Sequence, residues 1–234
     1  MSYRTLDPRQ IILTAEQLEL RIGERFPQAG LWRVARELVA LCRDADRAAA
    51  DLARPIWWLR ALVGLAIAAG GAVFLFVGTF LSFDRISTGA FDFVQGLEAS
   101  LNTVILAGLG FLALARAEER IKRRRVFREL HGLRSLIHVI DMHQLTKDPS
   151  TLSGNFTPTA HSPQRILSAP DLLRYLDYCS EMLSITGKLA ALFAQAVNDD
   201  VVANAVNDIE TLGSNLSRKI WQKITLIDAD MARR

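Results

Sequence analysis

The stretch LRALVGLAIAAGGAVFLFVGTFL, residues 59–81, decides the fold that we expect for this chain. Its 23 residues carry a single charged side chain, Arg60, near the start. A helix of this length measures roughly 34 Å, enough to cross a hydrocarbon core about 30 Å thick. Trp57 and Trp58 stand where an interfacial aromatic belt belongs, and Arg60 can extend to the same headgroup layer. We therefore predict a transmembrane helix over about 57–82.

A second apolar run, residues 101–115, is shorter and contains polar side chains. Because 15 residues span only about 22 Å, we expect this helix to extend over about 97–117 and to include Glu98. Asn102 and Thr103 lie in the same helix, and lipid accommodates such groups poorly. In an oligomer, this second helix is therefore the better candidate to face the central axis. The alternative is a helix that begins at the interface and thins the bilayer locally.

The distribution of charge predicts the orientation of this hairpin. The outer connection, residues 83–100, has one basic residue, Arg85, and a broad apolar face that predicts a short interfacial helix between Ser87 and Ser100. Its acidic residues are Asp84, Asp92 and Glu98. The basic residues that follow the second helix are Arg116, Arg120, Lys122, Arg123, Arg124, Arg125 and Arg128. By the positive-inside rule, we expect a multi-pass protein of a bacterial inner (plasma) membrane with both termini in the cytoplasm.

Two groups of polar residues are candidate sites. The candidates for contact with ions in a pore are Asp84, Asp92, Glu98, Asn102 and Thr103. In the simpler alternative, the acidic ones are ordinary loop residues that keep positive charge away from the outer side. The candidates for binding lipid headgroups are Arg120, Lys122, Arg123, Arg124 and Arg125. In the simpler alternative, this cluster only sets the orientation.

The N-terminal region, residues 1–55, is expected to form cytoplasmic helices. Thr14 and Gln17 have the spacing of a capping box, which predicts a helix from about Ala15 to just before Pro27. A second helix follows, with an apolar stripe formed by Leu31, Val34, Ala35, Leu38, Leu41 and Cys42.

The C-terminal region, residues 118–234, is expected to complete a helical bundle with a core of its own. Its first apolar stripe consists of Val126, Phe127, Leu130, Leu133, Leu136, Ile137 and Ile140, so the second membrane helix is expected to continue to about Gln144. Turn residues predict a loop over 146–168, and Ser168 followed by Pro170 predicts a new helix. The last two helices form a coiled-coil-like hairpin, whose final stripe consists of Val202, Val206, Ile209, Leu212 or Gly213, Leu216, Ile220, Ile224 and Ile227.

The remaining sequence features argue against a metal site, a nucleic-acid partner and catalysis. His131, His138 and Asp141 lie near one helical face and are weak metal candidates, but common ligand spacings are missing, so we predict no metal and no cofactor. Cys42 and Cys179 are expected to be reduced thiols packed as small apolar groups. The net charge of +3, concentrated beside an apolar segment, argues against a nucleic-acid partner. Because no catalytic fingerprint is present, we predict that the chain is not an enzyme.

The expected fold is therefore all-α, a two-pass transmembrane helical hairpin over residues 56–117 with a cytoplasmic helical bundle. We expect a homo-oligomeric ion channel or pore-like assembly in contact with membrane lipids, whose cytoplasmic helices serve assembly or gating. The alternative is a non-catalytic membrane scaffold or sensor whose bundle binds a cytosolic protein partner or a ligand. The layout resembles the bacterial SLATT modules, two-pass proteins with cytoplasmic helices proposed as membrane effectors in conflict systems. The likeness covers topology alone and carries no residue across.

Overall fold

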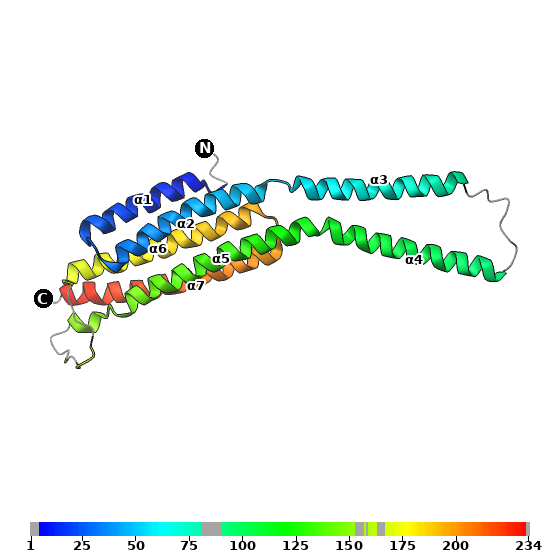
Figure 1. The fold of residues 1–234 in the computed structure, drawn as a ribbon. Coiled ribbons are helices and arrows are strands. Elements are labelled where there is room, and N and C mark those ends of the chain that lie inside the picture. Colours follow the sequence, from blue (N-terminus) through cyan, green and yellow to red (C-terminus); the bar gives the residue numbers. More distant parts are fainter. Residues whose placement is uncertain (1–4, 81–89, 153–156, 158, 163–166, 233–234) are drawn as a thin grey trace. The chain divides into compact units, whose positions relative to one another are not determined.

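The structure is a computed structural model, and the residues that it describes form helices without a strand (Figure 1). It describes residues 5–80, 90–152, 157, 159–162 and 167–232. Over 73–80 and 90–97, and at Ala99, Ser100, Thr103, Ala115 and Thr151, it describes the backbone alone. The helices are α1 (Pro8–Arg25), α2 (Gly30–Ala53), α3 (Trp57–Phe80), α4 (Ala90–Ala115), α5 (Ala117–Leu145), the short 3₁₀ helix η2 (Pro149–Leu152), α6 (Ala169–Ala196) and α7 (Asp200–Ala232).

The chain divides into two compact units. One unit combines Met1–Ala53 with Arg123–Arg234, and the other is Arg54–Lys122. The first unit is a helical bundle built from α1, α2, most of α5, α6 and α7. The second contains α3 and α4, which contact each other. The core of the bundle therefore draws on sequence from both sides of the apolar helices.

Helix α6 is the central element of the bundle, because it contacts α1, α2 and α7. Its fully buried side chains include Leu176, Met182, Leu183, Leu189 and Phe193. Helix α1 is further joined to α6 by ion pairs, including one of 3.0 Å between Arg25 Nη2 and Asp171 Oδ1. A second connects Arg21 and Glu181.

Most of the predicted apolar stripes are confirmed as core. In α2, the stripe from Leu31 to Cys42 is buried except for Leu41, which is half-buried. In α7, Gly213 rather than Leu212 takes the buried position. The exception is Phe127 of α5, which is 41% exposed although the sequence pattern placed it in the stripe. It follows Val126, which is fully buried, and consecutive helical residues point about 100° apart.

The predicted start of α1 is wrong. The helix begins at Pro8, and the side chain of Asp7 caps it by accepting a hydrogen bond of 2.9 Å from the Arg9 amide. Proline is well suited to the first helical position because its missing N–H is not needed there. The hydroxyl of Thr14 donates to the Gln10 carbonyl one turn earlier, at 2.7 Å. Thr14 is therefore an interior helix residue and not a cap.

The start of α6 is confirmed. Ser168 is its N-cap, and its hydroxyl accepts a hydrogen bond of 3.3 Å from the Asp171 amide, with Pro170 in the first turn. The predicted loop over 146–168 contains η2, whose Leu152 is buried.

The second apolar helix differs from the prediction in its length and its continuity, whereas the first does not. Helix α3 agrees with the predicted 57–82 to within two residues. Helix α4 begins at Ala90 and has 26 residues, about 39 Å of helix, so it is not the short helix predicted over 97–117. The separate interfacial helix predicted from Ser87 is likewise wrong from Ala90 onward, where the backbone is already part of α4. A one-residue turn at Arg116 separates α4 from α5, although the amides of Arg116 and Arg120 still donate to the carbonyls four residues earlier. The predicted helix to about Gln144 is therefore interrupted at this residue, and its end is confirmed at Leu145.

One segment of the described residues is long and apolar enough to cross a membrane. It lies within Gly30–Ala72, which takes in α2 and the first part of α3, and its most apolar window has a mean hydropathy of 1.4. Only 11% of that window is buried within the protein, whereas the core helix of a soluble protein is mostly buried. The residues that the structure describes therefore contain one candidate membrane-spanning helix on this criterion.

Two substitutions test the start of α1. Asp7→Ala removes the observed cap and should lower the free energy of unfolding by about 1 kcal/mol. Thr14→Ala removes a hydroxyl that caps nothing and should change it by less than about 0.5 kcal/mol, the range of neutral surface substitutions. Chemical denaturation followed by circular dichroism measures both values. A larger loss for Thr14→Ala than for Asp7→Ala would contradict the observed helix start.

Candidate functional site: the apolar hairpin and its basic end

Helices α3 and α4 present large apolar side chains that the rest of the chain does not cover. Among the described side chains of α3, they are Trp57, Trp58, Leu62, Leu65 and Ile67. Those of α4 are Leu101, Val104, Ile105, Leu106, Leu109, Phe111 and Leu112. Contiguous apolar surface of this kind is rare on soluble monomers and marks contact with lipid or with another protein surface.

Two polar side chains interrupt the apolar surface among the described side chains of α4. Glu98 and Asn102 are both exposed and four residues apart, so they lie on the same face one turn from each other. The other predicted pore residues are not tested in the same way: Asp84 lies outside the described residues, and the side chains of Asp92 and Thr103 are not described. The structure therefore brings together two of the five.

Glu118, in the first turn of α5, holds the basic end of the hairpin together. It accepts hydrogen bonds from the Ile56 amide at 3.3 Å and from Arg60 Nε at 3.2 Å, and it lies 3.1 Å from Lys122 Nζ. Burial alone would raise the pKa of its carboxyl, but the hydrogen bonds from Lys122, Arg60 and Ile56 outweigh burial and lower the pKa. The carboxylate therefore stays ionised and ties the start of α3 to the start of α5.

Only part of this arrangement follows from local sequence patterns. The spacing of Glu118 and Lys122, four residues apart, predicts a helical ion pair. The third partner, Arg60, is 58 residues away, so no local pattern could have joined it to Glu118.

A second carboxylate, Asp199, engages the basic segment in the bundle. Its Oδ2 lies 2.6 Å from Arg123 Nη2, while its Oδ1 accepts hydrogen bonds from the Val201 and Val202 amides at 2.9 and 3.2 Å. Asp199 thus caps α7 and binds α5 at once. Burial alone would raise the pKa of its carboxyl. The hydrogen bonds from Arg123 and the two amides have the larger effect, so the pKa is lowered.

These two carboxylates divide the predicted lipid-binding residues into two sets. Lys122 and Arg123 have protein partners, namely Glu118 and Asp199. The other three, Arg120, Arg124 and Arg125, are exposed.

The predicted histidine face does not assemble a metal site in the structure. His131 and His138 are exposed on α5, and Asp141 accepts a hydrogen bond of 2.5 Å from Gln144 Nε2. Among the described residues, no group of three or more His, Cys, Asp or Glu side chains could hold a metal ion.

Sequence reasoning missed His143, which packs inside the bundle. Its Nδ1 lies 3.3 Å from the Tyr175 hydroxyl, and a Cβ at Gly30 would lie only 2.6 Å from its Cε1. Gly30 is therefore required to admit the imidazole. Burial, with smaller contributions from Lys147 and Arg33, lowers the pKa of His143 and favours its neutral form.

The thiols of Cys42 and Cys179 are buried, as predicted, and neither forms a disulfide. Burial raises the pKa of each to about 12. Both are therefore protonated and unreactive near neutral pH.

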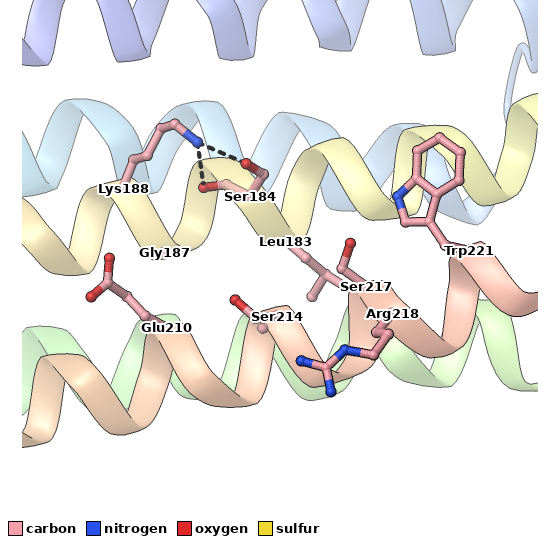
Figure 2. A pocket seen from close by; sticks show the side chains of 10 residues that line it. Leu183, Ser184, Gly187, Lys188, Glu210, Ser214, Ser217, Arg218 and Trp221 are labelled. Carbon is pink, nitrogen blue, oxygen red and sulfur yellow. Dashed lines mark hydrogen bonds between the residues drawn. The ribbon is translucent and has the colours of Figure 1, made fainter.

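A groove of about 520 Å³ runs between α6 and α7 (Figure 2). On one wall, Lys188 Nζ donates a hydrogen bond of 2.7 Å to the Ser184 hydroxyl. On the other wall, Glu210 and Arg218 flank Ser214, and the indole of Trp221 is 52% exposed. The groove has both charge signs and an aromatic edge.

Comparison with protein-family models, curated proteins and solved structures found no match to this chain.

Substitutions at Asp199 separate its two roles. Asp199→Asn keeps a good helix cap but loses the attraction to Arg123, whereas Asp199→Ala loses both. At pH 7 we expect the free energy of unfolding to fall by about 1 kcal/mol for Asp199→Asn and about 2 kcal/mol for Asp199→Ala. Chemical denaturation measures both, and equal losses would mean that the ion pair contributes nothing.

The stability difference between the wild type and Asp199→Asn should also depend on pH. Because the pKa of Asp199 is lowered in the folded state, its ionic contribution is complete above the unfolded-state pKa, about 3.9. That contribution disappears as the pH falls through the lower folded-state value. The difference between the wild type and Asp199→Asn should therefore shrink as the pH falls below about 3.9. A difference that grows in acid would contradict this assignment.

Proposed function

We propose that the chain is a two-pass membrane protein whose hairpins associate into a homo-oligomeric ion channel or pore-like assembly. The cytoplasmic bundle would then serve assembly or gating. The expected location is the inner (plasma) membrane, with both termini in the cytoplasm. The proposal includes no catalytic step and no cofactor.

The bundle core supports an even number of membrane crossings. Because α1 and α2 pack against α6, both ends of the chain must lie on the same side of any membrane. If α3 crosses, the chain must cross back before α6, and α4 is the apolar helix between them. At 26 residues, or about 39 Å, α4 is long enough to do so.

The observation that carries the pore proposal is the polar pair on α4. Glu98 and Asn102 share one face of α4, and exposing a carboxylate to lipid is costly. An aqueous axis formed by several copies of α4 removes that cost. Further along α4, apolar side chains such as Ile105 and Leu109 follow at helical spacing, where a ring of them can close a pore by excluding water.

A second candidate function is favoured by the groove between α6 and α7. A non-catalytic scaffold or sensor needs a place for a partner or ligand on its bundle, and the exposed Trp221 at this groove is the residue type that anchors such contacts. This function needs no axial opening. A dimer that keeps the bundle and conducts no ions would favour it over the channel.

Labelling of single cysteines tests the topology. Arg9→Cys in α1 and Asn204→Cys in α7 are exposed positions at the two ends of the bundle sequence. In intact cells, a membrane-impermeant maleimide should modify neither, and after permeabilisation it should modify both. The wild type is the control, because Cys42 and Cys179 are buried. Modification of one position alone in intact cells would contradict an even number of crossings.

The mass of the complex in mild detergent and its ion permeability test the pore. We expect three or more copies, and ion flux in proteoliposomes. Glu98→Gln should lower the cation-over-anion permeability ratio at least about fivefold, the factor given by roughly 1 kcal/mol of lost attraction. Glu119→Gln, an exposed carboxylate outside α4, is the matched control and should leave the ratio unchanged. A dimer without flux would overturn the proposal.

A further inference from the structure

We propose that one face of α5 binds the anionic phospholipid headgroups of the membrane in which the chain resides. This outer basic face consists of Arg124, Phe127, Arg128 and His131, with Arg125 beside it. The inference rests on the proposed function, because it requires the basic end of the hairpin to lie at a lipid surface.

The spacing of these residues places them on one side of the helix. Arg124, Phe127, Arg128 and His131 stand at positions i, i+3, i+4 and i+7, which share a helical face. All four are exposed, as is Arg125. The opposite side of α5 is core, formed by Val126, Leu130, Leu133 and Ile137.

The ion pairs formed by the basic residues of α5 show which of their side chains could still bind a headgroup. Arg123 is held by Asp199 of α7, and this contact fixes the rotation of α5 about its own axis. Within the part of the chain that the structure describes, no carboxylate lies within ion-pair distance of Arg124, Arg125 or Arg128. Three guanidinium groups are thus presented together, each able to bind a phosphate by two hydrogen bonds.

The exposed aromatic ring distinguishes this face from a simple solvated surface. Phe127 is 41% exposed between Arg124 and Arg128, although its neighbour Val126 is fully buried. An apolar ring among cations is typical of helices that lie in the headgroup region, where the ring enters the acyl boundary and the cations meet phosphates. A lipid surface would give the exposed ring of Phe127 an apolar environment.

The position of the face in the chain favours lipid over other phosphate-bearing partners. Only residues 116–123 separate Arg124 from Ala115, where the apolar α4 ends. The chain therefore cannot carry these arginines far from the leaflet if α4 crosses the membrane. The cytoplasmic leaflet is rich in anionic headgroups, and its attraction for arginine is strongest near the surface.

Native mass spectrometry of the full chain in mild detergent, after removal of bound lipid, tests this inference. The protein is titrated with phosphatidylglycerol and, separately, with phosphatidylcholine of the same acyl chains. For the wild type we expect tighter binding of phosphatidylglycerol. For R124Q/R125Q/R128Q we expect the phosphatidylglycerol affinity to fall about 100-fold, about fivefold for each arginine, with phosphatidylcholine unaffected.

Two further variants make the result specific. R134Q/R218Q/K219Q removes three charges from exposed positions elsewhere on the bundle and should change the phosphatidylglycerol affinity less than about threefold. Phe127→Ser should weaken both lipids alike, because the ring contacts acyl chains and not the headgroup. Thermal unfolding of each variant should match the wild type, since every substituted side chain is exposed.

Three outcomes would overturn the inference. One is an unchanged preference for phosphatidylglycerol in R124Q/R125Q/R128Q, and another is an equal loss in the control triple variant. The third is displacement of phosphatidylglycerol by equimolar inorganic phosphate or single-stranded DNA, which would assign the face to free phosphate or nucleic acid. Correct cysteine labelling without a lipid preference would reject this inference alone, whereas failed membrane insertion would reject the proposed function as well.

Discussion

The packing of α1 and α2 against α6 is the contact on which the rest of this structure depends. It buries apolar stripes that lie before and after the hairpin in the sequence, so that residues 54–122 form a closed loop emerging from one core. Burial of this kind contributes roughly 1.5–3 kcal/mol for each large side chain that is fully covered. The chain therefore leaves this core after Ala53 and returns to it at Arg123.

Two carboxylates then organise a segment that would otherwise repel itself. Glu118 pairs with Lys122 and Arg60, and Asp199 pairs with Arg123 while capping α7. Each acts as an acceptor for several donors, which is why its pKa is lowered in spite of burial. What remains is a basic surface of defined position, because the cations that have partners determine which way the others point.

The sequence predicted the parts of the fold that depend on local periodicity. The apolar stripes of α2 and α7, the cap at Ser168 and the extent of α3 are each confirmed, because burial at three- and four-residue spacing and capping chemistry are local signals. The start of α1 was missed because Thr14 and Gln17 match a capping box, yet Asp7 followed by Pro8 is an earlier and equally local signal.

The candidate site was less predictable from the sequence. The length of α4 was underestimated because Glu98, Ser100 and Asn102 interrupt its apolar run, and a hydropathy argument ends a membrane helix at polar residues even where the backbone continues. The pairs Arg60–Glu118 and Arg123–Asp199 join residues 58 and 76 positions apart, and only the tertiary fold brings them together. The role of His143 likewise depends on Gly30 and Tyr175, which come from other helices.

The closed loop also sets the order in which the molecule can be made. During synthesis, α1 and α2 leave the ribosome first, but α6, the helix that covers their apolar stripes, begins 116 residues after Ala53. At about 5–20 residues per second, those stripes wait on the order of ten seconds, while α3 and α4 emerge. The nascent chain must therefore keep α1 and α2 from aggregating, and it can finish its bundle only after the hairpin has found its own environment.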